Sequence, residues 1–129
     1  MRFNPLFLPV CLLKAELAVT VVGGFLLVPG TIDGNPVSFI VHTAAAQSLV
    51  DSGLAARLQL DRSGRQMARV QGLGGNVTAP IVRVPSFGVG RIEMLDRIMV
   101  AVPLPMEPSL DPPIGGVLGR DFLTFRAGR

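Results

Sequence analysis

The sequence of 129 residues has no tryptophan and no tyrosine, one cysteine and one histidine. The single cysteine, Cys11, excludes an internal disulfide, and one cysteine with one histidine leaves no ligand set for zinc. We therefore expect no metal site, and no motif calls for any other cofactor. With seven phenylalanines as the whole aromatic content, there is also little surface on which nucleic-acid bases could stack.

The chain also lacks runs of charge of one sign. Its formal net charge is +3 and its sequence pI is about 10.4, but the cations are scattered singly along the sequence. Phosphate-binding surfaces gather their cations into a patch or a stripe. We therefore expect a basic soluble surface and no nucleic-acid partner.

The apolar stretch at residues 3–13 is too short to span a bilayer. It follows Arg2, contains Pro5 and Pro9, and has about the length of a signal-peptide core. A secretory signal and an unstructured leader both fit residues 1–20. The localisation therefore stays open between the periplasm or secretion and the cytoplasm, and no stable membrane span is expected.

From Leu17 onward, short β-rich runs alternate with Gly, Pro and Asp at intervals of about 8 to 12 residues, which is typical of an all-β domain. An apolar content of 49% is ample for one core, so we predict a single domain over residues 21–129. The predicted strands cover residues 17–22, 25–32, 37–41, 67–70, 77–84, 87–89, 92–95 and 96–102. Asp33-Gly34 is expected to form a tight hairpin turn, and Pro29 to give its strand the character of an edge or a bulge.

One short helix is predicted, ending near Leu58. Leu54 and Leu58 fall on one face at a spacing of four, and Ser48 and Asp51 are both candidate caps for its start. A proline-rich loop at residues 103–113 follows the last predicted strand.

Three segments occur in a distinctive order. Residues 32–46 form a hairpin and an apolar strand that ends in His42-Thr43-Ala44. Gly72-Leu73-Gly74-Gly75 forms the tip of a second hairpin, and residues 117–123 read Val-Leu-Gly-Arg-Asp-Phe-Leu. Over roughly residues 20–125 this arrangement resembles the retropepsin-like aspartic proteases, most closely the bacterial aspartyl-protease-family proteins. The resemblance implies a single-lobe acid-protease barrel with a flap hairpin and one short helix, here without the terminal strand usual in the family.

The resemblance also assigns roles to these residues. His42, Thr43 and Ala44 stand where the family has its catalytic Asp-Thr-Gly. Gly72, Leu73, Gly74 and Gly75 correspond to the flap that covers the substrate. Leu118 and Gly119 belong to the element that packs behind the catalytic turn, where the family's acid at the position of Asp121 is structural.

Aspartic proteases need two carboxylates, one from each lobe, which share a proton and so divide the roles of acid and base. The imidazole of His42 cannot share a proton across a short contact between oxygens in the same geometry. In a symmetric dimer the pair would be histidine against histidine. Ala44 adds a methyl group where the family has Gly, whereas Thr43, which in the family helps to lock the lobes together, is kept.

These departures favour a pseudoenzyme that still holds a peptide or protein segment under the flap by strand addition, as a homodimer or beside a second protease-like lobe. Two alternatives stay open. One is an active aspartic endopeptidase, in which a partner lobe supplies the acid or His42 acts as base. The other is a decayed gene fragment. His42 also has a purely structural interpretation, as a polar side chain hydrogen-bonded to backbone.

Overall fold

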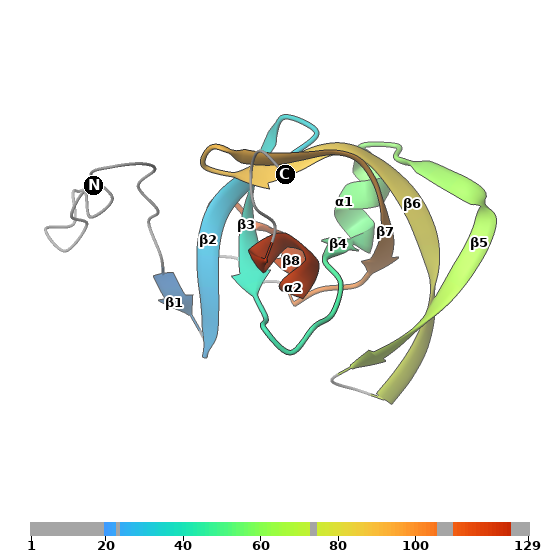
Figure 1. The fold of residues 1–129 in the computed structure, drawn as a ribbon, viewed down its shortest axis with the longest axis horizontal. Helices are drawn as coiled ribbons and strands as arrows, with labels where there is room; N and C mark the ends of the chain where they lie inside the picture. The colour runs from blue at the N-terminus through green and yellow to red at the C-terminus, as the bar shows by residue number, and fades with distance from the viewer. Residues whose placement is uncertain (1–19, 23, 73–74, 106–109, 125–129) are drawn as a thin grey trace, which may run out of the picture.

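The computed structural model describes residues 20–22, 24–72, 75–105 and 110–124 (Figure 1). The fold is all-β, as predicted, with two short helices where one was predicted. The strands are β1 (Thr20–Val22), β2 (Phe25–Ile32), β3 (Asn35–Val41), β4 (Leu49–Asp51), β5 (Asp61–Gly72), β6 (Gly75–Val89), β7 (Ile92–Val102) and β8 (Ile114–Leu118), and the helices are α1 (Ser52–Arg57) and α2 (Arg120–Leu123). The predicted leader falls almost entirely outside the described residues.

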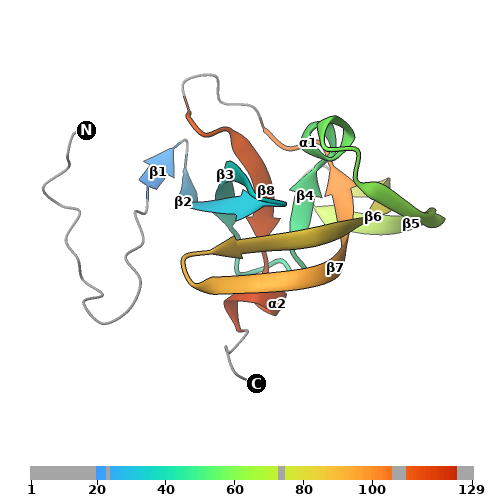
Figure 2. The same cartoon turned by 90° about the horizontal axis from the view of Figure 1, so that it is seen from above.

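The strands of the described chain form one sheet in the order β1-β2-β3-β8-β4-β7-β6-β5. A further pairing of β2 with β6, at Thr31↔Gly88 and Ile32↔Phe87, closes the central strands into a barrel. This closure needs glycine, because a Cβ on Gly30 would lie 2.4 Å from the carbonyl oxygen of Gly88. β1 and β5 remain as the two edges of the sheet, on opposite sides of the barrel (Figure 2).

β8 lies between β3 and β4, and this placement positions the candidate site. β3 runs parallel to β8, and β4 runs antiparallel to it. The chain therefore leaves β3, crosses the end of β8 through residues 42–48, and returns as β4 on the other side. We call residues 42–48 the crossing loop.

The core is apolar and aromatic. Phe87 lies between Phe39 and Phe122, with ring centroids 6.2 Å and 5.6 Å away, in tilted arrangements that aromatic pairs favour. Ile32 and Val50 are fully buried in the same cluster. Phe122 brings α2 into this core, so the last described helix is fixed against the barrel.

The turn chemistry was predicted correctly at Asp33-Gly34, where both residues have positive φ, 51° and 81°. Pro29 pairs with Ser38 on one side. On the other side, β2 pairs with β1 up to Leu27 and with β6 from Thr31 onward, so Pro29 has no partner strand there. The missing N–H of proline therefore removes no hydrogen bond between strands, in keeping with the predicted edge character.

Three other predictions are wrong. β7 is one strand rather than two, because Asp96 adopts a φ of 53° while its neighbours keep their register with β6. β5 and β6 extend well beyond the predicted strands. α2 was not predicted at all, since four residues are too few to show a helical period.

Asp51 caps α1, as one of the two predicted caps. Its Oδ2 accepts a hydrogen bond of 3.0 Å from the N–H of Leu54, and its Oδ1 accepts one of 3.0 Å from the N–H of Leu104. The prediction of Ser48 as a cap is wrong, because this side chain is buried in the crossing loop and bonds elsewhere. In the part of the chain described, no helix is long and apolar enough to cross a membrane.

Candidate functional site

The crossing loop begins with a tight turn at the end of β3. The N–H of His42 donates to the carbonyl of Leu118 over 3.0 Å, and the N–H of Ala45 donates to the carbonyl of His42 over 3.0 Å. His42 is half-buried, whereas Thr43 and Ala44 are exposed. The motif residues named from the sequence therefore lie together at the rim of the barrel, with the middle of the turn facing outward.

Leu118 and Gly119 lie directly behind this turn. Leu118 is fully buried, and the N–H of Arg120 donates to the carbonyl of Ala45 over 2.8 Å. A Cβ on Gly119 would lie 2.7 Å from the backbone C and O of Gln47, so only glycine lets the two segments approach this closely. Leu118 and Gly119 therefore lie directly against the crossing loop.

Ser48 ties the far end of the crossing loop to α2. Its hydroxyl donates to Asp121 Oδ1 over 2.7 Å and accepts from the N–H of Gly119 over 3.0 Å. The same carboxyl oxygen accepts from the N–H of Phe122 over 2.8 Å. Sequence reasoning missed this anchor, because nothing in the local pattern links a serine to an aspartate 73 residues later.

The carboxyl groups of the described residues lie away from His42 in the hydrogen-bond network. Asp121 is the one among them that is bonded to the crossing loop, and it contacts Ser48 rather than His42. Asp51 caps α1, and Asp96 forms an ion pair with Arg83. The remaining ones belong to other elements: Asp33, Asp61, Glu93 and Asp111.

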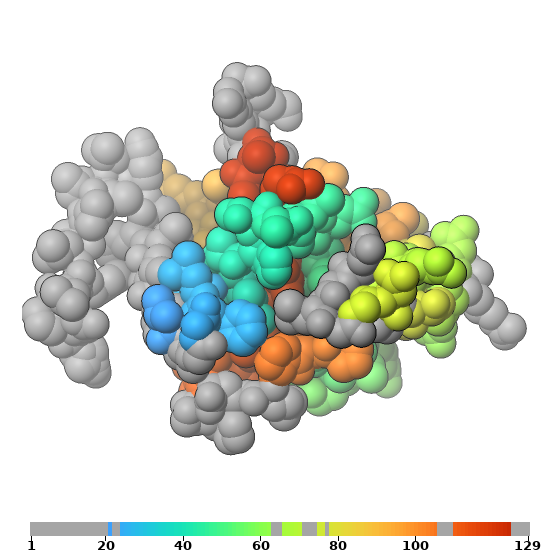
Figure 3. Space-filling model, turned by 90° about the horizontal axis from the view of Figure 1, so that it is seen from below, coloured from blue at the N-terminus to red at the C-terminus, as the bar shows by residue number. Residues whose placement is uncertain are grey.

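β5 and β6 form the second predicted hairpin, and its role as a flap stays a prediction. Gly72 pairs with Gly75 at its end, and Gly75 has a φ of 101°. Leu73 and Gly74, the predicted tip, lie outside the described residues. Figure 3 shows the crossing loop (blue-green) between the start of β2 (blue) and the end of the hairpin (yellow-green), all on one face of the molecule.

An apolar cluster lines the barrel side of this hairpin. Its buried members are Ala79, Val100 and Val102, and half-buried side chains pack against them from Leu49, Ala68, Val70, Ile81 and Leu104. Leu49 directly follows the crossing loop, so the cluster extends from the hairpin toward the candidate site. In the described ranges, no three His, Cys, Asp or Glu side chains gather in a group that could hold a metal ion.

A closed barrel, a loop that crosses the end of β8, and a glycine-rich hairpin over an apolar cluster together define a single-lobe aspartic-protease-like domain. Residues 28–122 match the sequence model of the aspartyl protease family, and the chain belongs to this family. Its fold is similar to the crystal structure of a retropepsin-like aspartic protease from Rickettsia conorii, with a TM-score of 0.57 and 19% sequence identity over 89% of this chain and 86% of that chain. None of the curated proteins compared with the chain matches it. The predicted family and fold are thereby confirmed.

Proposed function

We propose that this domain binds extended peptide segments under its flap and does not cleave them. The observation that carries the proposal is His42 at the end of β3, where the family has its catalytic aspartate, in a turn whose backbone hydrogen bonds are intact. The frame of the catalytic site is present without the acid that performs the reaction.

The loss of cleavage follows from the chemistry of the carboxyl pair. The family mechanism uses two carboxylates that share one proton, one toward the attacking water and one toward the scissile carbonyl. His42 offers a ring nitrogen instead, and the carboxyl group bonded to the crossing loop, Asp121, is engaged by Ser48 and by the N–H of Phe122. The part of the chain that the structure describes therefore supplies no acid to the pair.

Retention of binding is supported by the hairpin. β5 is an edge strand of the sheet, and extended peptides add to such edges through main-chain hydrogen bonds while pockets select their side chains. The apolar cluster that includes Val70 and Val100 favours peptides with apolar side chains. We further propose that a second copy of this chain, or a second lobe, packs against the exposed middle of the turn at Thr43 and Ala44.

The proposal is tested by measuring binding and integrity of the same peptide. A fluorescently labelled apolar fragment of denatured casein is titrated with the unaltered protein, followed by anisotropy, and then analysed by mass spectrometry. We expect saturable binding of a peptide that stays intact.

Val70→Asp, which places a charge in the apolar cluster, is expected to weaken binding by about tenfold or more. The matched control Thr78→Asp adds the same charge at an exposed position of β6 and is expected to bind normally. Equal binding by both variants, or a cleaved peptide, would contradict the proposal.

A further inference from the structure

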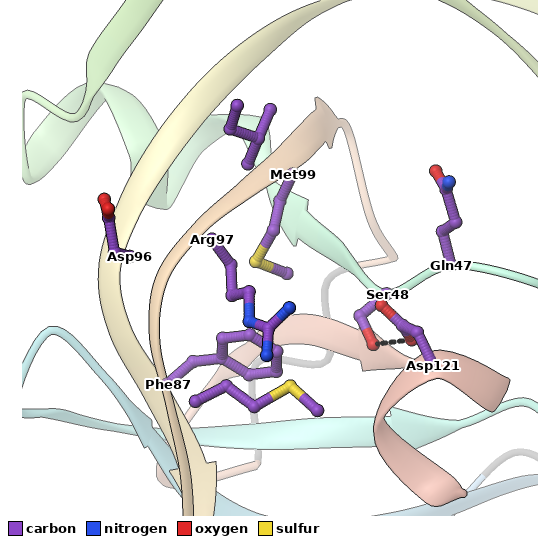
Figure 4. Close-up of a pocket in the computed structure, with 9 residues that line it drawn as sticks. Gln47, Ser48, Phe87, Asp96, Arg97, Met99 and Asp121 are labelled. Atoms are coloured by element: carbon purple, nitrogen blue, oxygen red, sulfur yellow. Dashed lines mark hydrogen bonds between the residues drawn. The ribbon is translucent and has the colours of Figure 1, made fainter. Parts of the chain in front are cut away.

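A cavity lies between β7 and α2 (Figure 4). Its volume is about 450 Å³, within the usual range of about 300 to 1,000 Å³ for small-molecule sites. Phe87, Met94, Met99 and Ile98 form its apolar part. Phe87, Met94 and Met99 belong to the buried core and form the floor of the cavity, whereas Ile98 is exposed.

This cavity is distinct from the proposed peptide site. It is lined by Gln47 and Ser48 of the crossing loop, but it contains neither His42 nor any residue of β5. A ligand bound here would touch the back of the loop whose front carries the catalytic position. The inference therefore goes beyond the proposed function and does not depend on it.

Two opposite charges face each other across the cavity. Arg97 comes from β7 and Asp121 from α2, and Figure 4 shows them on opposite walls. Within the described residues, the side chain of Arg97 forms no ion pair or hydrogen bond. Asp121 uses Oδ1 for both of its hydrogen bonds, and no described residue donates to its Oδ2. The charge of Asp96, also at the cavity, is already compensated by Arg83.

We propose that this cavity binds a free apolar amino acid. Its carboxylate would pair with Arg97, its ammonium group with Asp121 Oδ2, and its side chain would cover the apolar floor. Arg97 and Asp121 are both exposed, and a ligand with a single charge would pair with one wall only and leave the opposite charge without a new partner. A zwitterion with an apolar body satisfies both walls and the floor together.

Nuclear magnetic resonance of the full-length, ¹⁵N-labelled chain tests this assignment, with L-leucine as the probe. We expect saturable shifts of the backbone amides of Ser48, Arg97 and Asp121. N-acetyl-L-leucine lacks the ammonium group, L-leucinamide lacks the carboxylate, and glycine lacks the apolar body. We expect each of these compounds to bind at least about tenfold more weakly than leucine, because each lacks one charge-assisted contact or the apolar side chain.

Arg97→Gln is expected to weaken leucine binding by about tenfold or more, because it removes the charge that pairs with the carboxylate. Arg69→Gln removes the same charge from an exposed position of β5, away from the cavity, and is expected to bind leucine normally. Amide spectra without ligand show whether each variant is folded. The proposal is overturned if leucine gives no saturable shifts, if the shifts fall only elsewhere, or if leucine and its two derivatives bind the unaltered chain equally.

Discussion

The hydroxyl of Ser48 donates a hydrogen bond of 2.7 Å to Asp121 Oδ1, and Ser48 is only 2% exposed. The crossing loop and α2 are thereby held as one unit, although they lie far apart in the sequence. This unit keeps the turn at His42 in place.

Ser48→Ala tests the contribution of this bond. The substitution leaves the N–H of Gly119 without its partner and removes one donor from the Asp121 carboxylate. Because Ser48 and Gly119 are buried, we expect the free energy of unfolding to fall by about 1 to 3 kcal/mol, measured by urea denaturation. Ser86→Ala, at a half-buried serine with no side-chain hydrogen bond among the described residues, is the control and is expected to change stability by less than about 0.5 kcal/mol. Equal stabilities of the two variants would refute the anchoring role.

Gly119→Ala tests the close approach behind the turn. The added Cβ would meet backbone atoms of Gln47 at 2.7 Å and the carbonyl oxygen of Ala45 at 2.8 Å. Backbone cannot move aside cheaply, so we expect a loss of about 1 to 3 kcal/mol in the free energy of unfolding. Gly53→Ala, in α1, meets only side-chain atoms, Asp51 Oδ2 at 3.1 Å and Arg57 Nη1 at 3.7 Å, and gains helix propensity of up to about 1 kcal/mol. Thermal denaturation in which both variants behave alike would count against this packing.

Asp51→Ala tests the link between α1 and the segment after β7. The carboxylate caps the helix through Leu54 and also holds the N–H of Leu104. Loss of a cap costs about 0.5 to 2 kcal/mol, and we expect a value at or above the upper end because two bonds are lost. Asp61→Ala, at the exposed start of β5, is the control. A melting temperature no lower for the Asp51 variant than for the control would contradict the assignment.

The proposed pairing of two copies predicts a mass in solution of twice the chain mass of 13.6 kDa. Sedimentation equilibrium over a range of protein concentrations measures it. Because Thr43 is exposed in the single lobe, Thr43→Val is expected to weaken the association by removing its hydroxyl. A chain that stays monomeric at every concentration would exclude the homodimer.

Much of the fold could be predicted because its signals are local. The two adjacent residues Asp33 and Gly34 are types that favour positive φ, and both adopt it in the turn. Asp51 directly precedes α1, where a side-chain cap is expected, and it caps the helix. The position of His42 was inferred from the resemblance to the family, and the structure places it at the end of β3.

The parts that were missed depend on contacts between distant segments. Ser48 was interpreted as a cap because its bond to Asp121 is invisible in the sequence around it. The cavity between β7 and α2 was not predicted for the same reason, since Arg97 and Asp121 face each other only after the barrel has closed. Asp96 was interpreted as the start of a new strand, but β7 continues past it because the residues on both sides of Asp96 pair with β6.

The proposed loss of cleavage rests on His42 in place of the family's catalytic aspartate. Casein hydrolysis at acid and neutral pH compares the unaltered chain, the double variant His42→Asp with Ala44→Gly, and the control His42→Asn with Ala44→Gly, each with and without pepstatin. We predict no hydrolysis by the unaltered chain or the control, and pepstatin-sensitive hydrolysis by the double variant alone. Pepstatin-sensitive hydrolysis by the unaltered chain would contradict the account.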